Sequence, residues 1–104
     1  MFAISFVIPC YNAETFILKN IIQLKKKILS LKVAYEIILV DDGSDDNTPN
    51  ILKDITKKNK SINLIINKKN TGKSYSVLKG IKKKTIKYLS INKILPWSNN
   101  SFYK

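Results

Sequence analysis

The first part of the chain alternates between a continuous apolar run and regularly spaced apolar positions. The run Ala3–Ile8 ends at Pro9, the pattern of a strand buried on both faces of a parallel sheet. Asn12 is then a candidate N-cap for an amphipathic helix that lies on the sheet, opposite a lysine-rich polar side. The apolar positions of this helix recur at spacings of four and three: Ile17, Ile21, Leu24, Ile28 and Leu31.

The same alternation continues along the chain. Glu36–Val40 predicts a second strand, and the Asp-Asp-Gly-Ser that follows it is typical of a turn. Thr48 is the expected N-cap of a second helix, with Pro49 at its first position and its end near Asn59. Ile62–Ile66 predicts a third strand. A third helix is expected to carry Tyr75, Val77, Leu78 and Ile81.

This order of elements predicts an α/β fold. Strands that alternate with helices pair in parallel through right-handed crossovers, so the loops after the strands share one edge of the sheet, where ligands bind. Tyr88–Asn92 is a candidate fourth strand. We therefore expect a Rossmann-like half domain over residues 1–92, with three to four mostly parallel strands and helices on both faces, followed by an irregular tail over residues 93–104.

The formal charge of +12 changes this picture little. All nineteen basic residues are lysine, whereas arginine is favoured for recognition of phosphate and guanine, so specific nucleic-acid binding is not expected. The charge is uneven: six lysines face seven acids up to Asp54, whereas thirteen lysines and no acid follow. No stretch reaches the ~20 apolar residues of a membrane-spanning helix, so we expect a soluble, cytoplasmic protein. A single cysteine and no histidine leave only oxygen ligands for a metal.

Two strand ends carry the residues suited to binding chemistry. Tyr11 follows the first strand and Asp41 ends the second, so the topology brings an aromatic ring near a carboxylate. The ring can stack on a flat base and the carboxylate can accept a hydrogen bond from a ring N–H, which fits a pyrimidine such as uracil. The residues alone leave a second interpretation open, in which Tyr11 is a half-buried rim residue and the acids only form a turn and cap a helix.

Three ordered motifs favour the first interpretation. They are Ile-Pro-Cys-Tyr-Asn at residues 8–12, Val-Asp-Asp-Gly-Ser-Asp-Asp-Asn-Thr at residues 40–48, and Asn-x-Gly-Lys-x-Tyr at residues 70–75. Together they resemble the start of family 2 glycosyltransferases with the GT-A fold, over roughly residues 3–88. The resemblance implies transfer of a sugar from a nucleotide-diphosphate donor, a uridine diphosphate sugar in our interpretation, to an acceptor hydroxyl.

The resemblance also implies roles for individual residues. Tyr11 corresponds to the ring that packs on the base, and Asp41 to the carboxylate that binds it. Lys73 corresponds to a basic residue near the diphosphate, and a lysine at a helix N-terminus suits an anion. Cys10 is taken as a packing residue. The full set of expected nucleotide-binding residues is Pro9 at the base and ribose, Tyr11, Glu14 at the ribose rim, Asp41, Asp42 beside it, and Lys73.

The motif that holds the family's metal ion is missing. Alignment without gaps from Gly80 places the two aspartates of the Asp-x-Asp motif at positions that Lys93 and Leu95 occupy, and no acid lies downstream. The family expects Mg²⁺ or Mn²⁺ with the donor, and these ions need anionic oxygens. We therefore expect a truncated chain with no metal site, no general base and little or no activity. Full-length members of the family leave room for peripheral attachment to a membrane.

Three rival interpretations remain. Residues 67–74 end in Gly-Lys-Ser like the phosphate-binding loop of ATPases, but Asn67 replaces the leading glycine. Asp41 and Asp42 are similar to the acidic pair of response-regulator receivers, whose phospho-accepting aspartate has no counterpart after Asp54. A non-catalytic module that binds nucleotides or polyanions through its lysines is the third; loss of binding with added salt is compatible with that reading.

Overall fold

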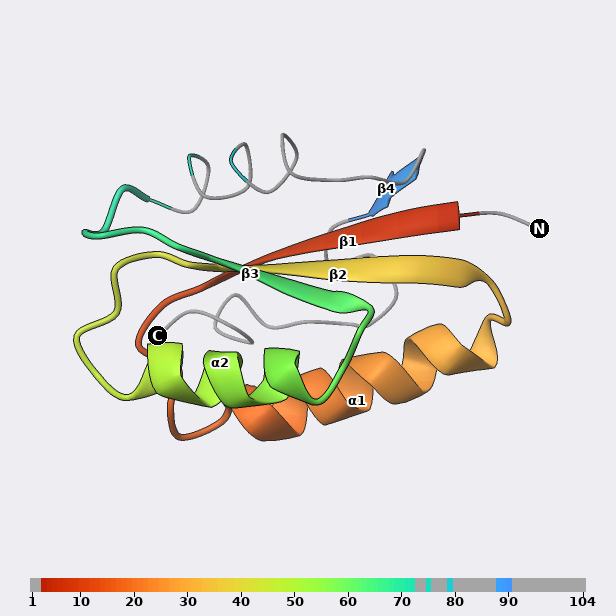
Figure 1. The fold of residues 1–104 in the computed structure, drawn as a ribbon, viewed down its shortest axis with the longest axis horizontal. Coiled ribbons are helices and arrows are strands. Elements are labelled where there is room, and N and C mark those ends of the chain that lie inside the picture. Colours follow the sequence, from red (N-terminus) through yellow and green to blue (C-terminus); the bar gives the residue numbers. More distant parts are fainter. Residues whose placement is uncertain (1–2, 73–74, 76–78, 80–87, 91–104) are drawn as a thin grey trace.

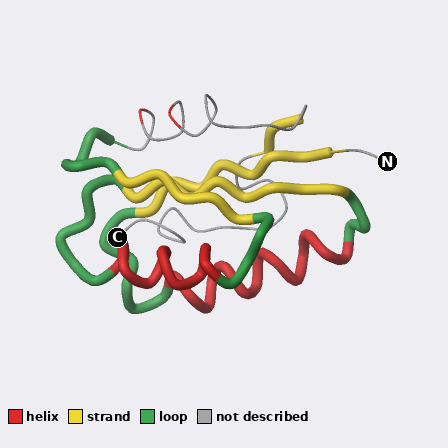
Figure 2. Tube along the Cα trace, viewed as in Figure 1, coloured by secondary structure: helices red, strands yellow, loops and turns green. Residues whose placement is uncertain are grey.

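A computed structural model describes residues 3–72, 75, 79 and 88–90 of the chain. The described part is an open parallel sheet with two helices packed on it (Figures 1 and 2). The strands follow the order β3-β2-β1-β4. Strands β2 and β3 are added on one side of β1, and β4 pairs with β1 on its other side. The elements are β1 (Ala3–Cys10), α1 (Ile17–Ser30), β2 (Ala34–Asp41), α2 (Thr48–Lys57), β3 (Ile62–Ile66) and β4 (Tyr88–Ser90).

The register aligns the ends of the three longer strands. Cys10, the last residue of β1, pairs with Asp41, the last residue of β2, and Asp41 pairs in turn with Ile66 at the end of β3. Because all three pairings are parallel, the loops that follow these strands leave the sheet side by side at one edge (Figure 1). The candidate ligand-binding edge therefore exists as the alternation predicts.

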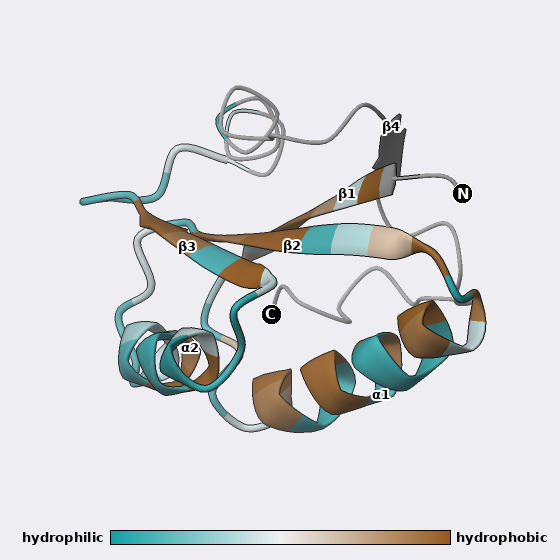
Figure 3. Cartoon of the chain, turned by 45° about the vertical axis from the view of Figure 1, so that its right-hand side comes forward, coloured by the Kyte–Doolittle hydropathy of each residue, from teal (hydrophilic) through white to brown (hydrophobic). Residues whose placement is uncertain are grey.

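The main core lies between the sheet and the two helices. Phe6, Ile8 and Ile37 point from the strands into one cluster with the buried stripe of α1, whose members are Ile17, Ile21, Leu24 and Ile28. The opposite face of the sheet carries a smaller cluster of Val7, Ile38, Val40 and the partly buried Ile65. Apolar residues predominate along the three longer strands, with polar segments in β2 and β3, whereas α1 alternates between apolar and polar positions (Figure 3).

The predicted α/β half domain with parallel strands is confirmed, and β4 confirms a fourth strand over the first three residues of the predicted segment. The N-cap predictions are wrong. Helix α1 starts at Ile17, where Phe16 is the N-cap, while Asn12 has φ +47° and belongs to the loop. Helix α2 already includes Thr48, and Asn47 precedes it as the cap.

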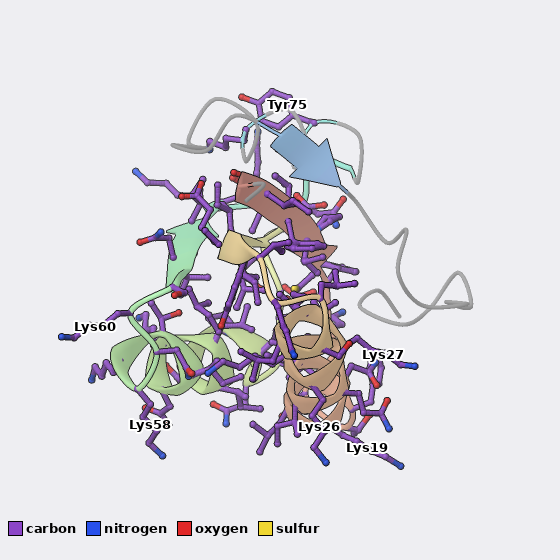
Figure 4. All side chains as sticks on the ribbon, turned by 90° about the vertical axis from the view of Figure 1, so that its right-hand side faces the viewer. Lys19, Lys26, Lys27, Lys58, Lys60 and Tyr75 are labelled. Carbon is purple, nitrogen blue, oxygen red and sulfur yellow. The ribbon has the colours of Figure 1, made fainter. Side chains whose placement is uncertain are left out.

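Several predictions fall on residues that the structure does not describe. Tyr75 and Lys79 are helical, and Tyr75 lies on the side of the sheet away from α1 and α2 (Figure 4). The other expected positions of the third helix, the expected strand residue Asn92 and the tail over residues 93–104 lie outside the described part. Across the residues that are described, no helix is long and apolar enough to cross a membrane.

Candidate functional site

Three loops meet at the carboxyl edge of the sheet. They are the first loop (residues 11–16), the second loop (residues 42–47) and the third loop (residues 67–72). The ladder continues one step into them, because the Asp42 N–H donates to the Cys10 carbonyl at 2.8 Å and the Asn67 N–H donates to the Asp41 carbonyl at 2.8 Å. The starts of the second and third loops are therefore fixed by the strands themselves.

Side chains join the first loop to the second. The Asn12 N–H donates to the Ser44 hydroxyl at 2.9 Å, and the Asn12 side-chain carbonyl accepts the Asp45 N–H at 2.9 Å. Asparagine tolerates the left-handed conformation of residue 12 better than most residues, so the reciprocal pair forms without much strain. One residue on, the Ala13 N–H donates to the Thr48 hydroxyl at 2.9 Å. The loop beside Tyr11 is thus held by the loop beside Asp41.

Glu14 and Asp46 make a second reciprocal contact nearer the surface. The Glu14 N–H donates to Asp46 Oδ2, and the Asn47 N–H donates to Glu14 Oε2, both at 3.3 Å. Asp46 Oδ1 also accepts the N–H and the hydroxyl of Thr48. Partial burial alone would raise the pKa of Asp46, but the hydrogen bonds from Thr48 and Glu14 outweigh it and lower this pKa below its usual value. Asp46 is therefore an ionised anchor for both loops.

Asp41 lies under the second loop with only 1% of its surface exposed. Its Oδ1 accepts the Ser44 hydroxyl at 2.6 Å and its Oδ2 accepts the Ser44 N–H at 3.3 Å. Burial raises its pKa; the two bonds from Ser44 lower it by less, and the nearby charges of Asp46 and Asp42 add to the rise. The site thus contains a buried carboxylate whose charge is only partly compensated.

Asp42 is fully buried and points toward the third loop. Its Oδ1 accepts hydrogen bonds from the Asn67 amide at 3.1 Å, the Thr71 N–H at 2.9 Å and the Thr71 hydroxyl at 2.9 Å. Its Oδ2 accepts the Gly72 N–H at 3.0 Å. A carboxylate that accepts several N–H bonds fixes the backbone that donates them. Asp42 therefore determines the shape of the third loop, which leads into Lys73.

Gly43 lets the second and third loops touch. It has φ +72°, and a Cβ built there would lie 2.2 Å from the carbonyl carbon of Lys69 and 2.3 Å from the backbone nitrogen of Asn70. Any larger residue would need both a left-handed conformation and a displaced third loop. The glycine of the second motif is thus explained by close packing of two backbones.

The structure brings five of the six predicted nucleotide-binding residues to this edge. Tyr11 is half-buried and follows Cys10 directly, so its backbone lies at the same end of the sheet as Asp41. Pro9 is buried opposite Val40 in the ladder. Glu14, Asp41 and Asp42 lie in or beside the first two loops. The sixth residue, Lys73, lies outside the described part of the chain.

A hollow of about 340 Å³ opens beside the third loop. Lys68, Lys69 and Lys79 line it together with Thr71 and Tyr75. The Lys79 ammonium donates to the Asn67 side-chain carbonyl at 2.8 Å and lies 5.8 Å from the centre of the Tyr75 ring. Three lysines and a hydroxyl around one hollow suit an anionic group such as a phosphate.

Sequence reasoning missed most of the residues that hold the loops. Ser44, Thr48, Asn67 and Thr71 all bond to a predicted site residue or its neighbours, although they were assigned only to turns and caps. Lys79 was also missed. Their polar side chains next to Asp41 and Gly72 were a usable signal, because a buried carboxylate requires donors nearby.

The residues that are described do not fit the metal ion that the family expects. Among them, no group of three acidic, cysteine or histidine side chains is placed to hold an ion. Asp42 is also fully engaged by the third loop, and Asp41 is enclosed by Ser44. We therefore derive no step that passes through a metal ion bound to these residues.

Comparison with known proteins identifies the family. The model of glycosyl transferase family 2 matches residues 5–91, which is most of the chain, so the chain belongs to glycosyltransferase family 2. An uncharacterized protein of Methanocaldococcus jannaschii is 42% identical over 77 residues, which make up 73% of this chain and 31% of that protein. The poly-beta-1,6-N-acetyl-D-glucosamine synthase of Staphylococcus epidermidis is 34% identical over 87 residues, or 83% of this chain and 20% of the synthase.

A solved structure supports the fold. The crystal structure of S. aureus TarS superposes with a TM-score of 0.69 at 22% identity, over 86% of this chain and 16% of TarS. The chain therefore has the GT-A, Rossmann-like fold that the resemblance implies. It spans less than a third of the length of these relatives.

Proposed function

We propose that this chain supplies the nucleotide-binding loops of a family 2 glycosyltransferase and binds the uridine diphosphate part of a sugar donor. The proposed reaction of the whole enzyme is transfer of the sugar to an acceptor hydroxyl. The observation that carries the proposal is the convergence of the loops after β1 and β2, which puts Tyr11 one residue beyond the Cys10–Asp41 pair. Family membership supports the class of donor.

The base is assigned to the first two loops. An aromatic ring gives a base a flat surface on which to stack. Tyr11 is only partly buried, so its ring can serve as that surface. The uracil ring N–H would bond to Asp41 in place of Ser44, since both Asp41 oxygens now accept from that residue. Glu14, which is exposed at the rim, and Pro9, which shapes the strand end, complete the base and ribose side of the proposal.

The diphosphate is assigned to the third loop. Lys68, Lys69 and Lys79 surround the hollow there, and the family motif adds Lys73. Asp42 is buried behind the loop, so its part in the proposal is to hold the Thr71 and Gly72 backbone rather than to touch the phosphates. The negative charge of the donor would in this way meet lysines and not the two aspartates.

We assign no catalytic residue to this chain. Deprotonation of an acceptor hydroxyl needs a base, and the metal of the family needs an Asp-x-Asp motif, but all seven acids precede Ile55. Our proposal is that the chain alone binds the donor and transfers sugar poorly or not at all. A cytoplasmic location is part of the same proposal.

Isothermal titration of the 104-residue chain with uridine diphosphate tests the proposal. We expect saturable binding at or below millimolar concentration, and weaker binding of ATP. Preference for ATP would instead favour the phosphate-binding-loop interpretation. Absence of uridine diphosphate binding at millimolar concentration, with and without Mn²⁺, would reject the proposal for this chain.

A further inference from the structure

Helix α1 carries a second apolar stripe that faces solvent. Its first stripe is buried against the sheet, whereas Leu18, Ile22 and Leu29 are 52%, 47% and 59% exposed. These three residues are spaced by four and seven positions, so they lie along one side of the helix. Large exposed aliphatic residues in a row are unusual on a soluble surface and indicate a partner.

The exposed stripe borders a groove between α1 and α2. The groove has a volume of about 480 Å³ and is lined by Leu18, Ile22 and Leu29 from α1 and by Ile51 and Ile55 from α2. The lining also includes Lys25 and Lys26 from α1, Lys58 just after α2, and one acid, Asp54. Aliphatic side chains beside three lysines and one acid leave the groove with a net positive charge, which is complementary to a partner that is itself apolar and anionic.

Lysines outnumber acids on the two helices and on the turn that follows α2. Helix α1, helix α2 and residues 58–60 together contain eight lysines. Asp54 is the one acid within these three segments. In Figure 4, Lys19, Lys26 and Lys58 extend away from the sheet and from Tyr75, whereas Lys27 and Lys60 extend to the two sides. We call this surface, with Leu18, Ile22 and Leu29, the basic helical face.

We propose that the basic helical face docks onto the surface of an anionic lipid membrane. Lysine ammonium groups would lie among the acidic headgroups while the aliphatic stripe enters the boundary with the acyl chains. A second copy of this chain is disfavoured because both copies carry a formal charge of +12. An acidic helix in the groove would pair with Lys25, Lys26 and Lys58 but leave the outlying lysines without a role.

The arrangement of the fold is compatible with this contact. Helices α1 and α2 form one layer beneath the sheet, and the three loops leave the sheet at its edge (Figure 1). A membrane against the outer side of the helices would therefore leave the loop edge open. This inference does not depend on nucleotide binding, and its test does not involve a nucleotide.

Co-sedimentation with lipid vesicles tests the inference. The chain is mixed with vesicles of phosphatidylcholine alone and with vesicles that contain equal parts of phosphatidylglycerol and phosphatidylcholine. We expect binding only to the second kind. The double change Lys19→Glu and Lys26→Glu should lower the partition coefficient at least about thirty-fold, because each lysine near an anionic surface contributes about 1 kcal/mol. The matched control is Lys68→Glu with Lys69→Glu, on the third loop, which alters net charge equally.

A second variant separates docking from simple charge attraction. Leu18→Ser with Leu29→Ser keeps every lysine, and we expect it to lose most of the binding that persists in added salt. All variants change exposed side chains, and far-UV circular dichroism checks that they fold. Equal losses in the two lysine pairs, an unchanged affinity in the leucine variant, or no binding to anionic vesicles would each overturn the proposal.

Discussion

Cys10 lies directly opposite Asp41 at the end of the parallel ladder between β1 and β2, and both side chains are almost completely buried. Burial raises the pKa of the Cys10 thiol well above its usual value, and the Asp41 carboxylate raises it further. The thiol therefore stays protonated and acts as a small packing group, as the sequence predicts. This pair forms the base of the site, because Tyr11 and Asp42 follow it immediately.

The first prediction concerns the ring of Tyr11. Tyr11→Ala should weaken uridine diphosphate binding by roughly five-fold to a hundred-fold, because loss of an aromatic stacking partner costs about 1–3 kcal/mol per base. Calorimetric titration measures the change. Tyr35→Ala is the control, since Tyr35 is also half-buried but lies at the opposite end of β2. Equal affinities for wild type and Tyr11→Ala would remove Tyr11 from the proposed site.

The second prediction concerns the carboxylate of Asp42. Asp42→Asn should lower the free energy of unfolding by about 3 kcal/mol, because an amide nitrogen would replace an acceptor of the Thr71 or Gly72 N–H. Urea denaturation measures the loss, and amide hydrogen exchange should show faster exchange at Thr71 and Gly72.

Asp45→Asn provides the comparison for Asp42, because Asp45 is an exposed acid in the same loop. We expect its free energy of unfolding to stay within about 0.5 kcal/mol of wild type. If both variants lost the same stability, or if exchange in the third loop were unaltered in Asp42→Asn, Asp42 would not hold that loop.

The third prediction compares two glycines with positive φ. Gly72→Ala should cost about 1–2 kcal/mol from backbone strain alone, because no atom lies within 4 Å of the added Cβ. Gly43→Ala should cost about 3 kcal/mol or more, because its Cβ would also collide with the backbone of Lys69 and Asn70. Chemical denaturation ranks the two variants. The reverse order would contradict the close packing of the second and third loops.

The fourth prediction uses the lowered pKa of Asp46. Its folded pKa lies below the usual 3.8, so its ionised form contributes stability that is fully present above pH 3.8 and is lost as the pH falls through the folded value. Asp46→Ala should cost about 1 kcal/mol at pH 7, because it removes the hydrogen bonds that Asp46 accepts from Thr48 and Glu14, and less in stronger acid. Urea denaturation over this pH range measures the difference.

The acid-dependent part of that difference needs its own control. Asp45→Ala removes the adjacent acid but none of the bonds that Asp46 makes to Thr48 and Glu14. Its stability should follow that of wild type across the same pH range. A gap between Asp46→Ala and wild type that stayed constant down to the lowest pH would show that charge on Asp46 contributes nothing.

The sequence predicted the sheet and the shared edge because both depend on patterns that recur locally. The apolar run before Pro9 and the alternation of strands and helices were sufficient to predict that Tyr11 and Asp41 end neighbouring strands. Which donors surround Asp42 could not be predicted, because the Asn67 and Thr71 contacts span 25 and 29 residues and depend on how the third loop turns.

The errors at the helix starts have a physical cause. Asn12 and Thr48 are both strong capping residues, and local statistics place them at helix ends. In the folded chain each finds a partner in the other loop: Asn12 bonds to Ser44 and Asp45, and Thr48 accepts the Ala13 N–H. Contacts between the two loops thus override the local preference for capping.

One hydroxyl connects the start of helix α2 to the loop that carries Tyr11. Thr48 Oγ1 accepts the Ala13 N–H and donates to Asp46, so this one side chain links the first turn of α2 to the first loop. A ligand that moves Tyr11 and the first loop would therefore also move the start of α2. Ligand binding at the loop edge and the tilt of that helix would be coupled to each other, even though Ala13 and Thr48 are 35 residues apart in the sequence.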